Sequence, residues 1–373
     1  MIKNYFWIGL AGLCLSGGLV GGFWWGQQSG ITTGLLSPVL SQSGVMKDTH
    51  LQKYSIANLA QLTLPATKLH TTKLLGDDDK FTSWQFEFDT IGGQMSGLMN
   101  VPKKLDGSQP PKVIVLIRGY VPSEIYQPGV GTRAAGEALA QNGYITLAPD
   151  FLGYGESDAE PSDVLEARFI KPAQIMNLIE NIKQVGVPIP SGPDRLTDAV
   201  LTKSDQIGIW AHSNGGQIAL TALEGLGQPI PTTLWAPVTA PFPYSILFFS
   251  DEDDDEGQAA RANTALFEKN YNAQDFSLTK HLDRLAGPLQ LHQGTSDEAV
   301  PVSWNREFKD KILAENKRRS EASSEQPSPA VTGSPLPTIA LKYFEYPGAD
   351  HNLKPGWDQA MARDLAFFQQ NLK

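Results

Sequence analysis

The chain has 373 residues, of which 41% are hydrophobic and 19% are charged, and its formal net charge is −10. This composition suits a globular protein with a sizeable core, and the acidity argues against a nucleic-acid partner, which would need a basic face. A single cysteine, Cys14, excludes an internal disulfide and a thiolate metal cluster.

An apolar segment opens the chain. Residues 5–25 are mostly apolar, and no charged residue stands between Lys3 and Lys47. About 20 apolar residues suit a bilayer span, whereas the apolar regions of signal peptides run to about 7–15. We therefore expect residues 1–25 to be a membrane anchor, with a cleaved signal segment or a buried helix as alternatives. The first two place the remaining chain outside the cytoplasm, either anchored to the membrane or secreted.

The next segment has little periodicity. Residues 26–69 are predicted to form a linker, because they begin with a stretch rich in Gly, Ser and Gln. A single domain is expected over residues 70–373. Within it, residues 81–91 alternate apolar and polar side chains as a half-buried strand does, and residues 94–101 are expected to pair with them. Residues 113–117 (VIVLI) form a continuous apolar run, which is typical of a strand covered on both faces.

Helices and strands then alternate. Helical patterns cover residues 131–142, 172–184, 217–226, 303–316 and 357–372, and strand patterns cover residues 144–148, 206–210, 232–236, 289–292 and 339–346. This alternation predicts an α/β fold with a mainly parallel sheet and helices on both faces. Functional loops should then gather at the carboxyl ends of the strands.

Two segments interrupt this order. Residues 239–286 are predicted to form a lid-like insertion, and residues 318–337, rich in Ser, Pro and Glu, a disordered one. The first contains an acidic run, residues 251–256. A calcium-binding EF-hand needs glycine and glutamate at its sixth and twelfth positions, where this chain has Glu256 and Ala262. We expect a solvated acidic loop, and no metal or cofactor.

The strongest chemical signal is the run from Gly208 to Gly216 (GIWAHSNGG). It is predicted to be a strand that turns sharply into a helix, which would push the hydroxyl of Ser213 out of the sheet as a nucleophile. Small residues on either side, Ala211 and Gly215, allow the strand and helix to approach closely. The backbone N–H of Asn214 would face a developing oxyanion. The alternative is a plain turn in which the serine only caps the helix.

A serine nucleophile needs a histidine base and an acid that orients it. Both should follow the serine at the ends of later strands, with the acid first. Asp297 follows the strand pattern at 289–292, and His351 follows the one at 339–346. Glu298 and Asp350 are alternative acids, and we favour Asp297. The other histidines lack the required order and loop position, and they are His50, His70, His212, His281 and His292.

These motifs resemble a known family. The stretch from residue 113 to 157, the serine turn, GTSDEAVP and YPGADH together are similar to the catalytic domain of the prolyl oligopeptidase (S9) family and to its dienelactone-hydrolase-like and esterase relatives. The resemblance covers about residues 80–373. It implies an eight-stranded α/β-hydrolase sheet and a triad of Ser213, Asp297 and His351. It also implies a second oxyanion donor in the loop after the third strand, where this chain has Tyr120.

Two features depart from the family pattern. Ala211 stands where the serine turn usually has glycine, and no β-propeller precedes the domain. The resemblance implies a serine peptidase acting on small peptides through an acyl-enzyme. A carboxylesterase with the same triad is the alternative, and an inactive binding domain is the third hypothesis. The sequence predicts no oligomeric state.

Overall fold

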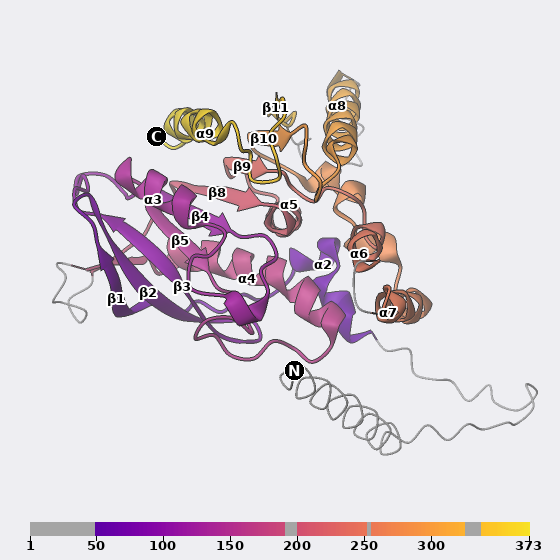
Figure 1. Ribbon diagram of the computed structural model, residues 1–373, viewed down its shortest axis with the longest axis horizontal. Coiled ribbons are helices and arrows are strands. Elements are labelled where there is room, and N and C mark those ends of the chain that lie inside the picture. Colours follow the sequence, from indigo (N-terminus) through magenta and orange to yellow (C-terminus); the bar gives the residue numbers. More distant parts are fainter. Residues whose placement is uncertain (1–48, 191–199, 252–254, 325–336) are drawn as a thin grey trace, which may run out of the picture. The chain divides into compact units, whose positions relative to one another are not determined.

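The computed structural model describes residues 49–190, 200–251, 255–324 and 337–373 (Figure 1). The predicted anchor at residues 1–25 lies outside this part of the chain and stays a prediction. Of the helices in the described residues, none has the length and apolar character needed to cross a membrane. The described unit begins at Thr49 and ends at Lys373.

The centre of this unit is a nine-stranded sheet (Figure 1). Its strands, in spatial order, are β1 (His70–Asp77), β2 (Phe81–Thr90), β3 (Gly93–Pro102), β5 (Ile145–Pro149), β4 (Val113–Ile117), β8 (Ile207–His212), β9 (Thr232–Trp235), β10 (Leu289–Gly294) and β11 (Leu341–Tyr346). The pairings from β5 to β11 are parallel, and those that add β3, β2 and β1 are antiparallel.

The expectation of eight strands is therefore wrong by one edge strand. Strand β1 has the sequence HTTKLLGD and no buried residue, so it carries no alternating apolar pattern that could have predicted it. A separate antiparallel pair, β6 (Val187–Ile189) and β7 (Val200–Thr202), was also not predicted. Both strands of that pair have only three residues, too few for a periodic signal.

Helices cover both faces of the sheet, as predicted. Helices α3 (Arg133–Gln141) and α9 (Trp357–Asn371) belong to one apolar core, and α4 (Val164–Gln184), α5 (Asn214–Leu226) and α8 (Val302–Ser324) to the other. The buried strand β4 contributes to both cores, because Ile114 and Leu116 face the first, and Val113, Val115 and Ile117 face the second. This alternation explains its uninterrupted apolar sequence.

Helix α4 begins eight residues before the predicted start at Pro172, which lies inside the helix. The carboxylate of Asp163 caps the helix by accepting hydrogen bonds from the backbone N–H groups of Leu165 (2.8 Å) and Glu166 (3.2 Å). This cap and the burial of Ala167, Phe169 and Ile170 outweigh the tendency of proline to sit at a helix start. The correction matters because these turns carry side chains of the site described below.

The linker prediction for residues 26–69 is wrong over residues 49–69. A 3-10 helix (His50–Tyr54) and α2 (Ile56–Leu59) pack into the core, where Ile56 is 0% and Leu59 1% exposed. The side chain of Asn181 on α4 accepts a hydrogen bond from the N–H of Thr67 (3.0 Å). The folded unit therefore starts at Thr49, and residues 26–48 lie outside the described part.

The lid-like insertion is folded onto the core where it is described. It contains α6 (Tyr244–Ser250) and α7 (Gln258–Asn270), followed by three short 3-10 turns. Phe267 on α7 packs against Phe169 of α4 in a tilted arrangement, with ring centroids 5.7 Å apart. Part of its acidic run, residues 252–254, lies outside the described residues.

The disorder prediction for residues 318–337 is wrong at both ends. Helix α8 continues to Ser324, and the side chain of Arg319 is only 3% exposed. Its guanidinium donates hydrogen bonds to the carbonyl oxygens of Leu282 (2.6 Å), Leu285 (3.0 Å) and Pro337 (2.6 Å). Composition alone predicted a solvated segment, because it does not show that one arginine joins three carbonyl groups. Residues 325–336 lie outside the described part.

Candidate active site

Ser213 occupies the turn between β8 and α5. Its backbone has φ 56° and ψ −126°, a strained conformation that non-glycine residues rarely adopt and that concentrates at functional sites. The neighbouring backbone is close, since a Cβ atom on Gly215 would lie 2.2 Å from the carbonyl oxygen of Ile117. The hydroxyl makes no capping hydrogen bond to the helix. The strained turn and the missing cap favour a half-buried candidate nucleophile over a simple capping serine.

Asp297 and His351 meet at the ends of two neighbouring strands. Because β10 and β11 pair in parallel, with Gly294 opposite Tyr346, the loops after them leave the sheet side by side. The Nδ1 atom of His351 donates to the Asp297 carboxylate, at 2.9 Å from Oδ2 and 3.1 Å from Oδ1. With its proton on Nδ1, the imidazole keeps Nε2 free to accept a proton.

The carboxylate of Asp297 is held by more than the histidine. Its Oδ1 atom accepts the backbone N–H groups of Ala299 (2.9 Å) and Val300 (2.8 Å), and its Oδ2 atom accepts the amide of Gln293 (3.0 Å). Burial by itself would raise the pKa of Asp297, but the hydrogen bonds from His351, Val300 and Gln293 outweigh it and lower the pKa. The acid is therefore ionised at neutral pH.

The two alternative acids have other positions. Glu298 is exposed, and Asp350 uses its Oδ1 atom within its own turn, where it accepts the N–H groups of Asn352 (2.9 Å) and Lys354 (2.8 Å). The hydrogen bond to His351 belongs to Asp297 alone among the described carboxylates. The preference for Asp297 therefore agrees with the geometry.

His212, next to the nucleophile, packs against the candidate base. Its Nε2 atom donates to the carbonyl oxygen of His351 (3.0 Å), and the two rings have centroids 4.6 Å apart. Burial, followed by the nearby His351, lowers the pKa of His212 to about 4, so this ring is neutral at pH 7. Within the described part of the chain, Ser213 Oγ makes no hydrogen bond to His351. Such bonds often tighten only when substrate is bound.

His292 is a structural residue, as predicted. It is fully buried, and its Nε2 atom donates to Asp364 Oδ1 (2.9 Å) while its Nδ1 atom lies 2.6 Å from the hydroxyl of Tyr346. The same carboxylate accepts Gln290 Nε2 (2.9 Å) and Trp235 Nε1 (2.7 Å). This buried network joins α9 to strands β9, β10 and β11, and so supports the strand ends that carry the acid and the base.

The two predicted oxyanion donors lie on the expected elements. Asn214 is the first residue of α5, and Tyr120 lies in the loop after β4; both line one cavity of about 570 Å³ together with Ser213. The loop is fixed from behind by the buried Arg118, whose guanidinium donates to the carbonyl oxygens of Gly119 (3.0 Å) and Asp150 (2.9 Å). The ring of Tyr120 is 77% exposed. Their role as donors stays a prediction.

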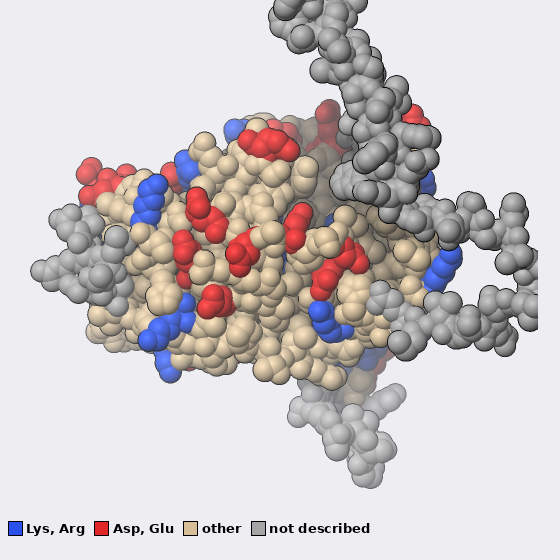
Figure 2. Space-filling model, turned by 90° about the horizontal axis from the view of Figure 1, so that it is seen from below, with Lys and Arg blue, Asp and Glu red and all other residues tan. Residues whose placement is uncertain are grey.

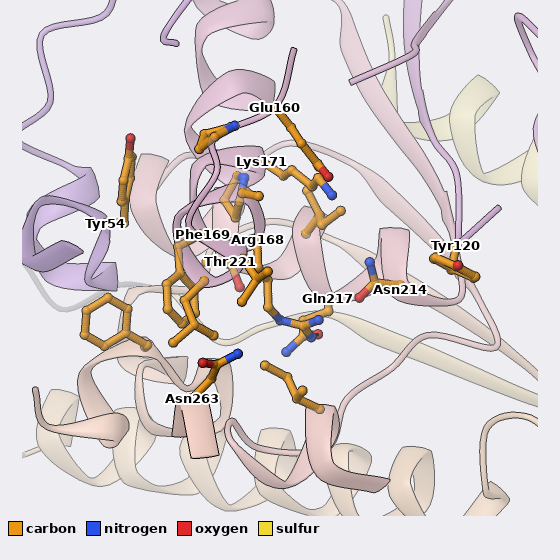
Figure 3. Close-up of a pocket in the computed structure, with 18 of the residues that line it drawn as sticks. Tyr54, Tyr120, Glu160, Arg168, Phe169, Lys171, Asn214, Gln217, Thr221 and Asn263 are labelled. Carbon is orange, nitrogen blue, oxygen red and sulfur yellow. Dashed lines mark hydrogen bonds between the residues drawn. The ribbon is translucent and has the colours of Figure 1, made fainter. Parts of the chain in front are cut away.

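Sequence reasoning missed the charged side chains of a second cavity, of about 660 Å³, which Tyr120 and Asn214 also line (Figure 3). Arg168 and Lys171 reach it from the first turns of α4, which were not predicted to be helical. Burial lowers the pKa of Arg168 to about 10 and that of Lys171 to about 8. The Lys171 ammonium also feels Glu160, which raises its pKa, and the cations Arg118 and Arg168, which lower it.

No group of three or more His, Cys, Asp or Glu side chains in the described residues could hold a metal ion. The expectation that the protein uses no metal or cofactor stays a prediction.

Comparison with known proteins gives similarity in structure but not in sequence. No protein-family model matches the chain, and no curated protein matches it. Among solved structures, acetyl xylan esterase 1 from a Thermoanaerobacterium species matches with a TM-score of 0.51 at 12% identity, over 85% of this chain and 93% of that one. An esterase of Pyrococcus furiosus matches with a TM-score of 0.50 at 17% identity, over 82% and 99%.

A proposed dipeptidyl aminopeptidase IV from Bacteroides ovatus matches with a TM-score of 0.51 at 14% identity, over 83% of this chain but 36% of that longer one. These structures and the mostly parallel sheet decide the fold. The chain has the α/β-hydrolase fold. Ser213, Asp297 and His351 lie in the order and at the strand ends that the sequence predicted, and their catalytic roles stay predictions.

Proposed function

We propose that this protein is a serine hydrolase that cleaves its substrate through an acyl-enzyme. The observation that carries the proposal is the His351–Asp297 pair beside the strained turn of Ser213. A serine on a strained turn, with a histidine and an ionised acid beside it, is the arrangement that activates a hydroxyl for attack. A serine that served only the fold would need neither.

The chemistry follows from the hydrogen bonds. His351, with its Nδ1 proton held by Asp297, takes the proton of Ser213 as the hydroxyl oxygen attacks the substrate carbonyl. The carboxylate stabilises the imidazolium that forms, and does not itself take the proton. The imidazolium then gives its proton to the leaving group as the bond to the acyl carbon breaks. Water, activated by the same histidine, hydrolyses the acyl-enzyme and restores the serine.

The oxyanion of each tetrahedral intermediate needs two donors. The backbone N–H of Asn214, at the start of α5, supplies one, and the positive end of the helix dipole adds to it. The loop of Tyr120 supplies the other, through its backbone N–H or its hydroxyl.

An ester is the substrate class that we propose first. The chain spans nearly the whole length of the two esterases to which it is similar, but only about a third of the aminopeptidase. Cleavage of small peptides, which the resemblance to the S9 family implies, is the second candidate. The structural likeness to the aminopeptidase, over 83% of this chain, is the observation in its favour.

Labelling and kinetics test the proposal. A fluorophosphonate probe should label Ser213 and no other residue, and Ser213→Ala should lower kcat by on the order of 10³-fold or more, since the three groups act as a unit. Ser245→Ala is a matched control, because Ser245 lines the same cavity and should leave labelling intact. Rates with p-nitrophenyl esters and with aminoacyl or prolyl amides then decide between the two substrate classes. Absence of both labelling and turnover would instead support a binding domain.

A further inference from the structure

The cavity of about 660 Å³ beside the nucleophile has a charged wall (Figure 3). Three of its lining side chains are charged, and they are Arg168, Lys171 and Glu160. Two cations and one anion give this wall a net charge of +1, inside a chain whose own net charge is −10. On the face shown in Figure 2, by contrast, acidic side chains are spread between isolated basic ones.

In the part of the chain that the structure describes, neither cation is neutralised by an ion pair. Among the described residues, no carboxylate lies within 4.0 Å of the Arg168 guanidinium or the Lys171 ammonium. The one hydrogen bond recorded for Arg168 goes from Nη2 to the neutral amide oxygen of Gln217. Taking a cation out of water costs free energy unless an anion or several acceptors compensate it, and burial lowers the pKa of both groups here. The wall therefore has the chemistry to receive an anion.

The charged wall is continuous with the nucleophile. Arg168 lines both cavities, the larger one with Lys171 and the smaller one with Ser213. Its partner Gln217 lies in the first turn of α5, which begins directly after Ser213, and it lines the larger cavity together with Asn214. In Figure 3, Gln217 lies between Arg168 and Asn214. A substrate whose carbonyl meets Ser213 can thus place a second group at the guanidinium.

On the proposed function of this site, we infer that the preferred substrate carries a carboxylate, which Arg168 binds while the scissile carbonyl lies at Ser213, with Lys171 adding positive charge to the same wall. A guanidinium binds a planar carboxylate with two parallel hydrogen bonds, and the ammonium elsewhere on the wall adds a favourable charge. A doubly charged phosphate fits less well, because Glu160 lines the same wall and would repel it.

Matched ester pairs test the inference. Mono-p-nitrophenyl glutarate and p-nitrophenyl valerate differ only by a carboxylate in place of a terminal methyl group. We expect kcat/KM to favour the glutarate ester, or one homologue in a succinate-to-suberate series, by about 10-fold or more, the effect of a charged hydrogen bond. If the carboxylate belongs to the leaving group, 4-carboxyphenyl valerate should instead exceed phenyl valerate, measured by acid release.

Variants assign the preference to the two cations. Arg168→Gln and Lys171→Met should each reduce the ratio between the charged and the neutral ester, towards 1 in the double variant. Lys183→Met is the matched control, because Lys183 lies on the same helix α4 but outside both cavities, and it should keep the full ratio. A loss of the ratio in the control as well would contradict the assignment.

A binding measurement separates this inference from the proposed function. In Ser213→Ala, which cannot turn over substrate, glutarate should raise the melting temperature more than glutaramide or inorganic phosphate does, and adding Arg168→Gln should abolish the difference. Hydrolysis of the charged and neutral esters at equal rates, with no stabilisation by glutarate, would overturn the inference and leave the hydrolase intact. Stabilisation without any hydrolysis would support the anion site and refute the hydrolase.

Discussion

Replacing the Asp297 carboxylate by an amide tests how the candidate base is oriented. In Asp297→Asn the amide oxygen has to take the place of Oδ1, because that position faces two fixed backbone donors, the N–H groups of Ala299 and Val300. The amide NH₂ group then faces His351 Nδ1. A donor at this position holds the imidazole proton on Nε2, so the ring can no longer accept a proton from Ser213.

The contacts of Asp297 set the expected size of the effects on activity and on stability. Loss of the correct tautomer and of the negative charge should lower kcat by about 10³- to 10⁴-fold, or about 4–5.5 kcal/mol of activation free energy. Stability should change far less, because the two backbone hydrogen bonds remain and only the amide of Gln293 faces a new donor, at a cost of about 1–3 kcal/mol. For a folded unit of this length, that cost corresponds to a melting temperature about 2–5 °C lower.

Steady-state hydrolysis of a p-nitrophenyl ester and thermal unfolding followed by circular dichroism measure the two effects on the same preparation. Glu298→Gln is the matched control, since Glu298 is the adjacent, exposed carboxylate. Activity of Asp297→Asn within 10-fold of the parent would refute the tautomer argument. An equal loss of activity in Glu298→Gln would also refute it, because the assignment of Asp297 as the acid would then no longer be supported.

Three further predictions concern other charged groups. Because burial lowers the pKa of Lys171 to about 8, its ammonium loses its proton as the pH rises through 8. The preference for a carboxylate ester should therefore fall between about pH 7 and 9. Lys171→Arg, which keeps its charge over this range, should retain the preference. Asp364→Ala leaves three buried N–H donors without an acceptor, at about 1–3 kcal/mol each, and should lower the melting temperature by about 5 °C or more. Burial first, and then Asp283, raise the pKa of Glu224 well above its usual value. Its neutral form therefore stabilises the fold at low pH, and that contribution to the unfolding free energy is lost as the pH rises above about 4.5. Glu224→Gln should flatten this dependence on pH.

Each of these three has a contrary outcome. A carboxylate preference that is constant from pH 6 to 10 would show that Lys171 takes no part. Gln359→Ala, an exposed change on the same helix as Asp364, should alter stability by less than about 0.5 kcal/mol, and an equal effect would contradict the network argument. An unchanged pH dependence in Glu224→Gln would mean that this carboxyl is not the titrating group.

The sequence predicted the parts of the fold whose signals are local. The runs VIVLI and GIWAH are buried on both faces, and the turns after β10 and β11 carry Asp297 and His351 as expected. These elements can be predicted because a buried parallel strand and the loop after it are formed by adjacent residues. The triad residues could be found for the same reason.

The missed features depend on contacts between distant segments. Strand β1 is recognised only through its pairing with β2, and the packing of residues 49–69 depends on α4 and α5, more than 100 residues away. Arg168 and Lys171 precede the helix that the sequence predicted, and nothing in the sequence distinguishes them from ordinary surface residues. Only the packing of α5 and α7 around them turns that surface into the wall of a cavity.

Because Arg319 fixes the end of α8, the contact between Asp297 and His351 does not depend on the number of residues between them. Asp297 and His351 are 54 residues apart in the sequence, yet the loops that carry them follow two paired strands. The guanidinium of Arg319 joins the end of α8 to Pro337, ahead of the second of these strands. The length of chain between Ser324 and Pro337 therefore does not set the geometry of the pair. That junction is a place where a tag, a reporter domain or new chain ends could be introduced, and where related sequences could differ in length without disturbing the chemistry.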